Sequence, residues 1–228
     1  MKKLFKFIMW IIILFLGLSI GGVVIYGFAP VPVSPLMLIR LGQQFRNGEQ
    51  LKLAHEWVPL EEISPELPRA VWASEDQNFF NHDGFDFDAI EQALKEKSQK
   101  GRVRGASTIS QQTAKNVFLW PSSTWTRKAF EAYFTVLIEV FWSKQRIMEV
   151  YLNTIEMGRG IYGAEAVALE HFGCHASDLN QNQCALIASS LPNPLKMDSG
   201  NPTGYMYRRQ SQIKRQMRNL GPFPTEDK

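Results

Sequence analysis

Cysteine is almost absent from this chain of 228 residues, which has only Cys174 and Cys184. Two thiols are too few for a disulfide framework or for a zinc site built from thiolates. Their separation of ten residues permits one disulfide in an oxidising compartment but does not specify it, so the sequence leaves their bonding open. Histidine is also rare: His171 and His175 are four apart, but Gly173 lies between them, and this pattern does not indicate a metal site.

A large excess of charge is also missing. The net charge is +3 and 21% of the residues are charged, so bulk charge does not indicate nucleic-acid binding. Any anionic ligand must be met by a local basic cluster. Hydrophobic residues make up 45% of the chain, enough for the core of one medium-sized domain. We predict a cytoplasmic N-terminus and membrane anchor over 1–30, a linker and domain start over 31–60, and the main domain over 61–228.

Charged residues disappear between Lys6 and Arg40, and residues 7–29 form an apolar run. A helix rises about 1.5 Å per residue, so this run reaches about 35 Å, slightly more than the hydrocarbon core of a bilayer. Trp10 and Tyr26 lie towards its two ends, where amphipathic rings favour the membrane interface. The run therefore predicts a single transmembrane helix.

The flanks of this run indicate its orientation. Lys2, Lys3 and Lys6 precede it and no short basic loop follows, which places the N-terminus in the cytoplasm and the domain outside. A cleaved signal peptide is the alternative, but its apolar region would be about 7–15 residues long. Proline at positions 30 and 32 follows without a clear cleavage site, which favours a retained anchor.

Alternating strand patterns are scarce, and helical periodicity dominates the rest of the chain, so we predict a mainly α domain. Ser107 is the expected N-cap of the helix at 108–118, Ser177 that of the helix at 177–190, and a bend is expected near Ser143. The expected helices are 67–74, 86–97, 108–118, 127–142, 144–153, 163–172, 177–190 and 205–219.

The densest polar cluster combines Glu75, Asp76, Phe79, His82 and Gly84. Aromatic neighbours surround it in the sequence. A carboxylate in such a setting is partly desolvated, which raises its pKa and makes it a better base near neutral pH. An ordinary helix-end pair of acids beside buried aromatics is the alternative interpretation.

Two further clusters combine polar and basic residues. In the first, Gln112, Lys115 and Asn116 are spaced to share one helical face, and their side chains suit sugar hydroxyls and phosphate oxygens. A capped, solvated helix start is the alternative. This cluster also contains Ser107, Thr108 and Gln111.

The second of these clusters is Arg127-Lys128-x-x-Glu131, in which Lys128 and Glu131 face the same way on a helix. It predicts a basic site for pyrophosphate beside a second carboxylate, or alternatively a surface ion pair worth a few tenths of a kcal/mol.

Most residues of one last segment are expected to pack in the core, whether or not the segment has a functional role. It runs from 144 to 153 and includes Glu149, Tyr151 and Asn153.

Taken in order, these segments resemble the bacterial peptidoglycan glycosyltransferases of family 51, in their monofunctional biosynthetic form without a transpeptidase domain. The resemblance covers about 61–202 and includes Gly-x-Tyr-Gly at 160–163, His-Phe-Gly at 171–173 and Leu-Pro-Asn-Pro at 191–194. Five motifs in order are highly specific. Ser110 and Met148 stand where the family often has threonine and leucine; neither is charged, so neither puts catalysis in doubt.

The resemblance implies a lysozyme-like helical fold with a small membrane-associated lobe. It implies polymerisation of lipid II, a disaccharide-pentapeptide on undecaprenyl pyrophosphate, into β-1,4-linked glycan for cell wall biogenesis and cell shape. Glu75 would be the general base and Glu131 a second catalytic carboxylate. Substrate and pyrophosphate would be bound by Asp76, Phe79, His82, Gly84, Ser107, Thr108, Gln111, Gln112, Lys115, Asn116, Arg127 and Lys128.

The leaving pyrophosphate needs charge neutralisation more than protonation. Lys115, Arg127 and Lys128 could supply it, as could Mg or Mn held by Glu131, and the sequence does not decide between them. The expected partners are lipid II, the nascent glycan, membrane lipids and cell wall proteins of division or elongation, without nucleic acid. The expected location is the inner membrane, with the catalytic domain periplasmic.

Two rival functions remain open. A lytic enzyme would use Glu75 as an acid to cut existing glycan, and a non-catalytic scaffold would only bind envelope proteins.

Two segments of the sequence each have two possible structural interpretations. Residues 117–125 are either a buried loop or a lobe dipping into the bilayer, and the basic helix at 205–219 is either a solvated face or a site for anionic headgroups.

Overall fold

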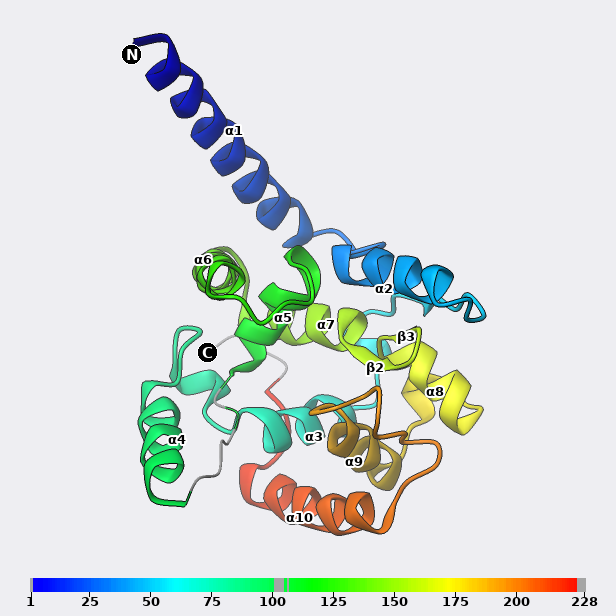
Figure 1. Cartoon of the computed structure of the whole chain (residues 1–228). Helices are drawn as coiled ribbons and strands as arrows, with labels where there is room; N and C mark the ends of the chain where they lie inside the picture. The colour runs from blue at the N-terminus through cyan, green and yellow to red at the C-terminus, as the bar shows by residue number, and fades with distance from the viewer. Residues whose placement is uncertain (1, 101–104, 106, 225–228) are drawn as a thin grey trace.

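In this computed structural model, which describes residues 2–100, 105 and 107–224, one long helix projects from a mainly helical body (Figure 1). The projecting helix is α1 (Lys2–Tyr26), and the body contains the remaining helices and one small sheet. The predicted mainly α class is confirmed. Methionine 1 and the last four residues of the predicted domain lie outside the described residues.

Helix α1 is long and apolar enough to cross a membrane, with a mean hydropathy of 2.7 over its most apolar window. Most of its side chains are exposed, but Ser19 and Val23 are buried against α6 (Trp125–Phe141) and the residue after it. Ser19 Oγ lies 2.7 Å from Tyr133 Oη, and Trp142 Nε1 donates a hydrogen bond of 2.7 Å to Val23 O. This candidate membrane helix is therefore packed against the domain at its C-terminal end.

All the predicted helices are present, with ends shifted by at most three residues except at the start of α9. Ser143 separates α6 from α7 as expected, and it caps α7. The segment predicted as linker and domain start also carries a helix, α2, whose amphipathic pattern the sequence reading passed over. The body helices are α2 (Pro35–Arg46), α3 (Glu66–Glu75), α4 (Phe87–Lys100), α5 (Ile109–Phe118), α6 (Trp125–Phe141), α7 (Lys144–Thr154), α8 (Ala164–Phe172), α9 (Gln181–Ser190) and α10 (Gly204–Leu220), with 3-10 turns η1 (Leu60–Glu62), η2 (Phe79–Asn81) and η3 (Ala176–Asp178).

Two predicted N-caps are wrong. Thr108, not Ser107, caps α5: its hydroxyl accepts from Gln111 N, and the Gln111 side chain bonds back to Thr108 N. Ser177 lies inside η3, and α9 starts four residues later with Asn180 as its cap. In both cases several polar residues compete for one cap position, and the packing of the helix on its neighbours decides between them.

A three-stranded sheet in the order β1-β3-β2 joins distant segments. β1 (Ala54–His55) pairs in parallel with β3 (Ile161–Tyr162), and β2 (Glu156–Gly158) pairs with β3 in antiparallel fashion with a register irregularity. The sequence reading missed these strands because two or three residues are too short to show alternation.

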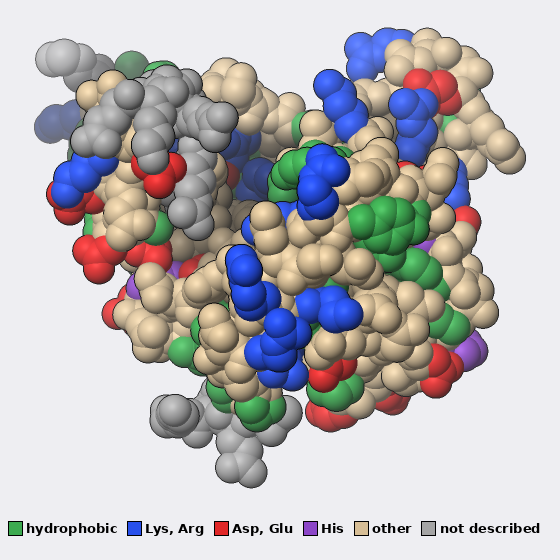
Figure 2. All heavy atoms as spheres, turned by 90° about the horizontal axis from the view of Figure 1, so that it is seen from below, with side chains coloured by type: hydrophobic (Ala, Val, Ile, Leu, Met, Phe, Trp, Pro, Cys, Tyr) green, Lys and Arg blue, Asp and Glu red, His purple; other side chains and the backbone are tan. Residues whose placement is uncertain are grey.

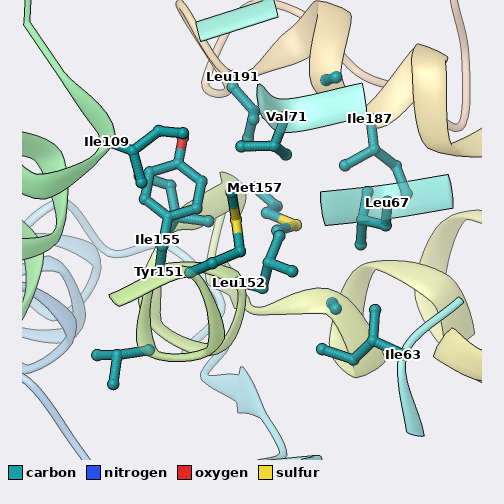
Figure 3. Packing of buried hydrophobic residues seen from close by; sticks show 14 of the residues in the cluster. Ile63, Leu67, Val71, Ile109, Tyr151, Leu152, Ile155, Met157, Ile187 and Leu191 are labelled. Atoms are coloured by element: carbon teal, nitrogen blue, oxygen red, sulfur yellow. The ribbon is translucent and has the colours of Figure 1, made fainter. Parts of the chain in front are cut away.

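The hydrophobic core lies where α3, α7 and α9 meet (Figure 3). Leu67 and Val71 of α3 face Ile187 of α9, while Tyr151 and Leu152 come from α7. All five are buried, and burying a large apolar side chain contributes about 1.5–3 kcal/mol. This packing fixes the C-terminal end of α3, where the candidate base lies.

The two cysteines, whose bonding the sequence leaves open, carry free thiols in the structure. Cys184 is buried on α9 and Cys174 is partly exposed beyond α8. Burial raises the pKa of the Cys184 thiol to about 12, which keeps it protonated near neutral pH.

Candidate active site

Glu75 is the last residue of α3, and its carboxylate is held from two sides. Gln112 Nε2 donates to Glu75 Oε2 at 2.9 Å, and Ser74 Oγ donates to Oε1 at 3.3 Å. Gln112 is itself fixed, because its Oε1 accepts from Tyr151 Oη at 3.3 Å. Desolvation raises the pKa of Glu75, and these hydrogen bonds only partly oppose it. A half-buried carboxyl of raised pKa is suited to proton transfer near neutral pH.

Glu75 faces a polar cavity of about 260 Å³. Carboxylates from two segments line it, Asp76 beside Glu75 and Asp86 and Asp88 around the start of α4. Ser107 and Thr108 contribute hydroxyls. Carboxylate, amide and hydroxyl groups accept and donate hydrogen bonds in the way that sugar hydroxyls require.

Asp76 and His82 bind each other. His82 Nε2 lies 3.1 Å from both oxygens of Asp76, and Gly84 N donates to His82 Nδ1 at 3.1 Å. Because Nδ1 accepts a hydrogen bond, the proton of a neutral His82 is on Nε2, where it donates to Asp76. Asp76 Oδ2 also accepts from Ile109 N at 3.1 Å. The pair therefore ties the end of α3 to the start of α5 and orients Glu75.

Phe79 and Gly84 support the site from behind. Phe79 has no exposed surface, and the Lys144 ammonium lies 4.7 Å from the centre of its ring. Gly84 has a φ of +87°, and a Cβ at this position would come within 2.7 Å of Thr135 Cγ2. Both were predicted as substrate-binding residues; in the structure both are buried and shape the loop between α3 and α4.

Helix α5 links Glu75 to the basic cluster. Lys115 lies three residues beyond Gln112, hence on the same helical face. Asn116 is buried and donates to Gln112 O at 2.7 Å. Desolvation lowers the pKa of Lys115, although the nearby Glu131 carboxylate raises it. A partly desolvated ammonium interacts strongly with an incoming anion.

Arg127, Lys128 and Glu131 lie together near the start of α6. Arg127 Nη1 and Lys128 Nζ pair with different oxygens of the buried Glu131 carboxylate. The rings of Phe118 and Phe134 stack with their centres 4.5 Å apart, and this contact packs the end of α5 against α6. With Lys115, three cations surround one carboxylate, so the cluster has a net positive charge.

The described residues do not fit a resident metal ion at Glu131. Both of its oxygens already accept from basic side chains. Within residues 2–100, 105 and 107–224, no group of three or more His, Cys, Asp and Glu side chains is placed to hold a metal. The basic side chains are therefore the groups in this part of the chain that can neutralise an anion.

Comparison with known proteins adds to this geometry. Residues 42–218 match the family model described as Transglycosylase. A biosynthetic peptidoglycan transglycosylase from Bacteroides thetaiotaomicron is 54% identical over 227 residues, which cover 100% of this chain and 92% of that protein. The chain belongs to this transglycosylase family. Proteins of the same description from Bdellovibrio bacteriovorus and Pseudomonas putida are 51% and 47% identical, over 93% and 96% of this chain and 85% and 92% of theirs.

In this transglycosylase, the motif on α7 stabilises the packing around the candidate active site. Arg146 Nη1 pairs with Glu149 Oε2 at 2.7 Å. Asn153 Oδ1 accepts from Val58 N and its Nδ2 donates to Val58 O, both at 2.9 Å, so this one amide holds the segment before α3. Tyr151 is fully buried, and desolvation raises its pKa well above the usual value. These contacts agree with the packing role predicted for Glu149, Tyr151 and Asn153.

Sequence reasoning missed the contribution of α10 to the cavity. Arg209 and Gln216 line it, and Arg209 Nη2 donates to Ser74 O at 3.3 Å. The Arg209 charge also lowers the pKa of Glu75, against the larger effect of desolvation. No local signal distinguishes Arg209 from the other basic residues of its helix, so only the tertiary structure could reveal its place.

Proposed function

We propose that this transglycosylase polymerises lipid II into β-1,4-linked glycan strands and releases undecaprenyl pyrophosphate. Glu75 takes the proton from the 4-hydroxyl of the acceptor N-acetylglucosamine. That oxygen forms a bond to the anomeric carbon of the N-acetylmuramic acid at the end of the growing chain. The bond from this carbon to the pyrophosphate oxygen breaks, and its electron pair leaves with the diphosphate. Attack from the opposite face converts an α-linked donor into a β-linked product.

The raised pKa of Glu75 in the cavity wall is the observation on which this proposal mainly rests. A base should have a pKa closer to the working pH than a solvated carboxylate has. Gln112 and Ser74 hold the two carboxylate oxygens in place, so little reorganisation is needed when the proton arrives. Hydroxyls of a bound sugar would find acceptors on the surrounding acidic and amide side chains.

The basic cluster supports pyrophosphate as the leaving group. Lys115, Arg127 and Lys128 gather on the side of α5 that leads away from Glu75 towards α6. Negative charge accumulates on the diphosphate as the bond breaks, and preorganised cations at that point lower the barrier. Glu131, expected to be a second catalytic carboxylate, would act by positioning Arg127 and Lys128.

The proposed location follows from α1. Its hydropathy suits a single-pass anchor, and the three lysines at its start favour a cytoplasmic N-terminus, which puts the active site on the outer face of the inner membrane. Lipid tails of the substrate would share the bilayer with α1. We expect glycan strands without cross-links, since the similar proteins are described as transglycosylases alone, and we expect assembly with division or elongation proteins of the cell wall.

Glu75→Gln tests the base. The full-length variant should fold, with a melting temperature at or above that of the wild type, because an amide avoids the cost of burying a charge. Its rate of lipid II polymerisation should fall by about 10²–10⁴-fold, the usual contribution of a positioned base. Product strands are measured by gel electrophoresis of labelled lipid II with and without a chelator.

Glu91→Gln is the matched control, since its carboxylate is exposed on α4 and pairs with the equally exposed Lys95. This variant should polymerise at the wild-type rate. Polymerisation by Glu75→Gln at that same rate would overturn the assignment of the base. Soluble fragments released from purified sacculi by the wild type would instead support a lytic enzyme.

A further inference from the structure

Helix α10 lies at the end of the body opposite to α1 (Figure 1). Its buried side, formed by Met206, Ile213 and Met217, packs on α9 and α3. If α1 spans the membrane, the outer face of α10 points away from it. This position argues against the alternative that the basic helix binds anionic headgroups of the same membrane.

The outer face of α10 is strongly basic, and Figure 2 shows Lys and Arg side chains gathered across the middle of this end of the molecule. The helix has no acidic residue. None of its basic side chains pairs with a carboxylate within the described residues, although 225–228 are not described. The basic residues of this surface, called here the α10 basic face, are Arg208, Arg209, Lys214, Arg215 and Arg218.

The α10 basic face begins at the catalytic cavity. Arg209 lines that cavity together with Glu75, whereas the neighbouring wall carries Asp76, Asp86 and Asp88. Arg208 and Arg215 are seven residues apart, so both lie on the exposed side of α10, next to Arg209. Charge is therefore separated: carboxylates line the cavity wall, whereas the cations of α10 begin with Arg209 in the cavity and continue along the exposed side of the helix.

We propose that the α10 basic face binds the peptide carboxylates of the nascent glycan as the strand leaves the cavity. This inference rests on the proposed function, because a strand made from lipid II carries one peptide, ending in a carboxylate, on each disaccharide. The sugar backbone is neutral and suits the polar cavity. The peptides are anionic, so the acidic wall repels them and the arginines outside attract them.

The geometry favours the nascent glycan over a lipid surface as the ligand of the α10 basic face. The product grows away from the bilayer while its lipid end stays there, so a strand emerging beyond Glu75 meets α10 and not α1. Repeated weak ion pairs along a polymer keep it near the enzyme by raising its local concentration, without a single tight site. Such contacts would lengthen the strands made before release.

The test compares Arg208→Gln/Arg215→Gln/Arg218→Gln with Arg46→Gln/Lys95→Gln/Arg159→Gln, which removes the same charge from exposed positions elsewhere. Full-length proteins in neutral detergent are titrated with soluble, lipid-free glycan fragments that carry peptides, and with the same fragments after peptide removal. The α10 variant should bind peptide-bearing fragments about tenfold more weakly, since three exposed ion pairs are lost. The control variant should bind like the wild type.

The other outcomes separate the possibilities. Wild-type binding that is equal with and without peptides, or an α10 variant with unchanged affinity, would overturn the inference. Loss of binding to anionic lipid vesicles, with fragment binding unchanged, would assign the face to lipid instead. The titration needs no catalysis, so failure of the wild type to polymerise lipid II would count against the proposed function alone. Shorter strands from the α10 variant in the polymerisation assay would support both.

Discussion

The carboxyl of Glu75 lies in surroundings that oppose its ionisation, while three neighbours favour the charged form. Desolvation is the largest influence and raises its pKa. Hydrogen bonds from Gln112 and Ser74 and the charge of Arg209 lower it. The net effect is a carboxyl that takes up a proton more readily than a solvated glutamate does, which is the property required of a general base near neutral pH.

Gln112→Ala should shift the pH dependence of the reaction. If Glu75 is the general base, as proposed, it must be deprotonated to work, so the rate rises as pH rises through its pKa. Removing the Gln112 donor takes away a contact to the charged form and raises that pKa further. The acidic limb of kcat against pH should therefore move to higher pH, in addition to a lower maximum.

Gln77→Ala is the control for this shift, because Gln77 lines the same cavity while its side chain bonds to Ala73 O. Its acidic limb should coincide with that of the wild type. A limb that stays in place or moves to lower pH in Gln112→Ala would contradict the role given to this amide.

Helix α5 orients much of the site, and its first turn is fixed by Thr108. The hydroxyl accepts from Gln111 N at 3.2 Å and donates to Gly84 O at 2.7 Å, so it joins the helix to the His82 loop. Thr108 is also largely buried, so a side chain without the hydroxyl would leave these backbone groups poorly solvated. The cap therefore couples helix stability to the geometry of the loop behind Glu75.

Thr108→Ala should lower the free energy of unfolding by about 1–2 kcal/mol, the usual cost of losing a cap together with a buried hydrogen bond. Thr108→Ser keeps the hydroxyl and should lose less. Ser107→Ala, at the exposed position before it, should change stability by less than about 0.5 kcal/mol. Chemical denaturation compares the three, and equal losses at 107 and 108 would contradict the observed cap.

At the scale of the molecule, contacts between α1 and the body fix the position of the candidate active site relative to this candidate membrane helix. Arg146 of α7 donates from Nε and Nη2 to Tyr26 O, at 3.1 and 2.8 Å, and from Nη2 to Ala29 O. It thus binds the carbonyls at the end of α1, where helix backbone groups otherwise lack partners. Trp142 binds the same helix one turn earlier.

Arg146→Gln should loosen this junction. We expect faster proteolysis within residues 27–34 and a loss of about 1–3 kcal/mol in unfolding free energy, since hydrogen bonds from a charged donor are removed. Arg159→Gln is the control, because Arg159 is exposed and pairs with Glu49, far from the junction in the sequence. Cleavage of both variants at the wild-type rate would show that the junction does not depend on Arg146.

The sequence by itself determined the apolar anchor, the helical class and the order of the motifs, because these depend on local periodicity and on residue type. Ser143 marked the break between α6 and α7 for the same reason. The short sheet, the caps of α5 and α9, and the placing of Phe79 in the core depended on packing between distant segments. Only the tertiary structure brought Arg209 to the cavity of Glu75, because that contact joins residues more than a hundred positions apart and has no local signal.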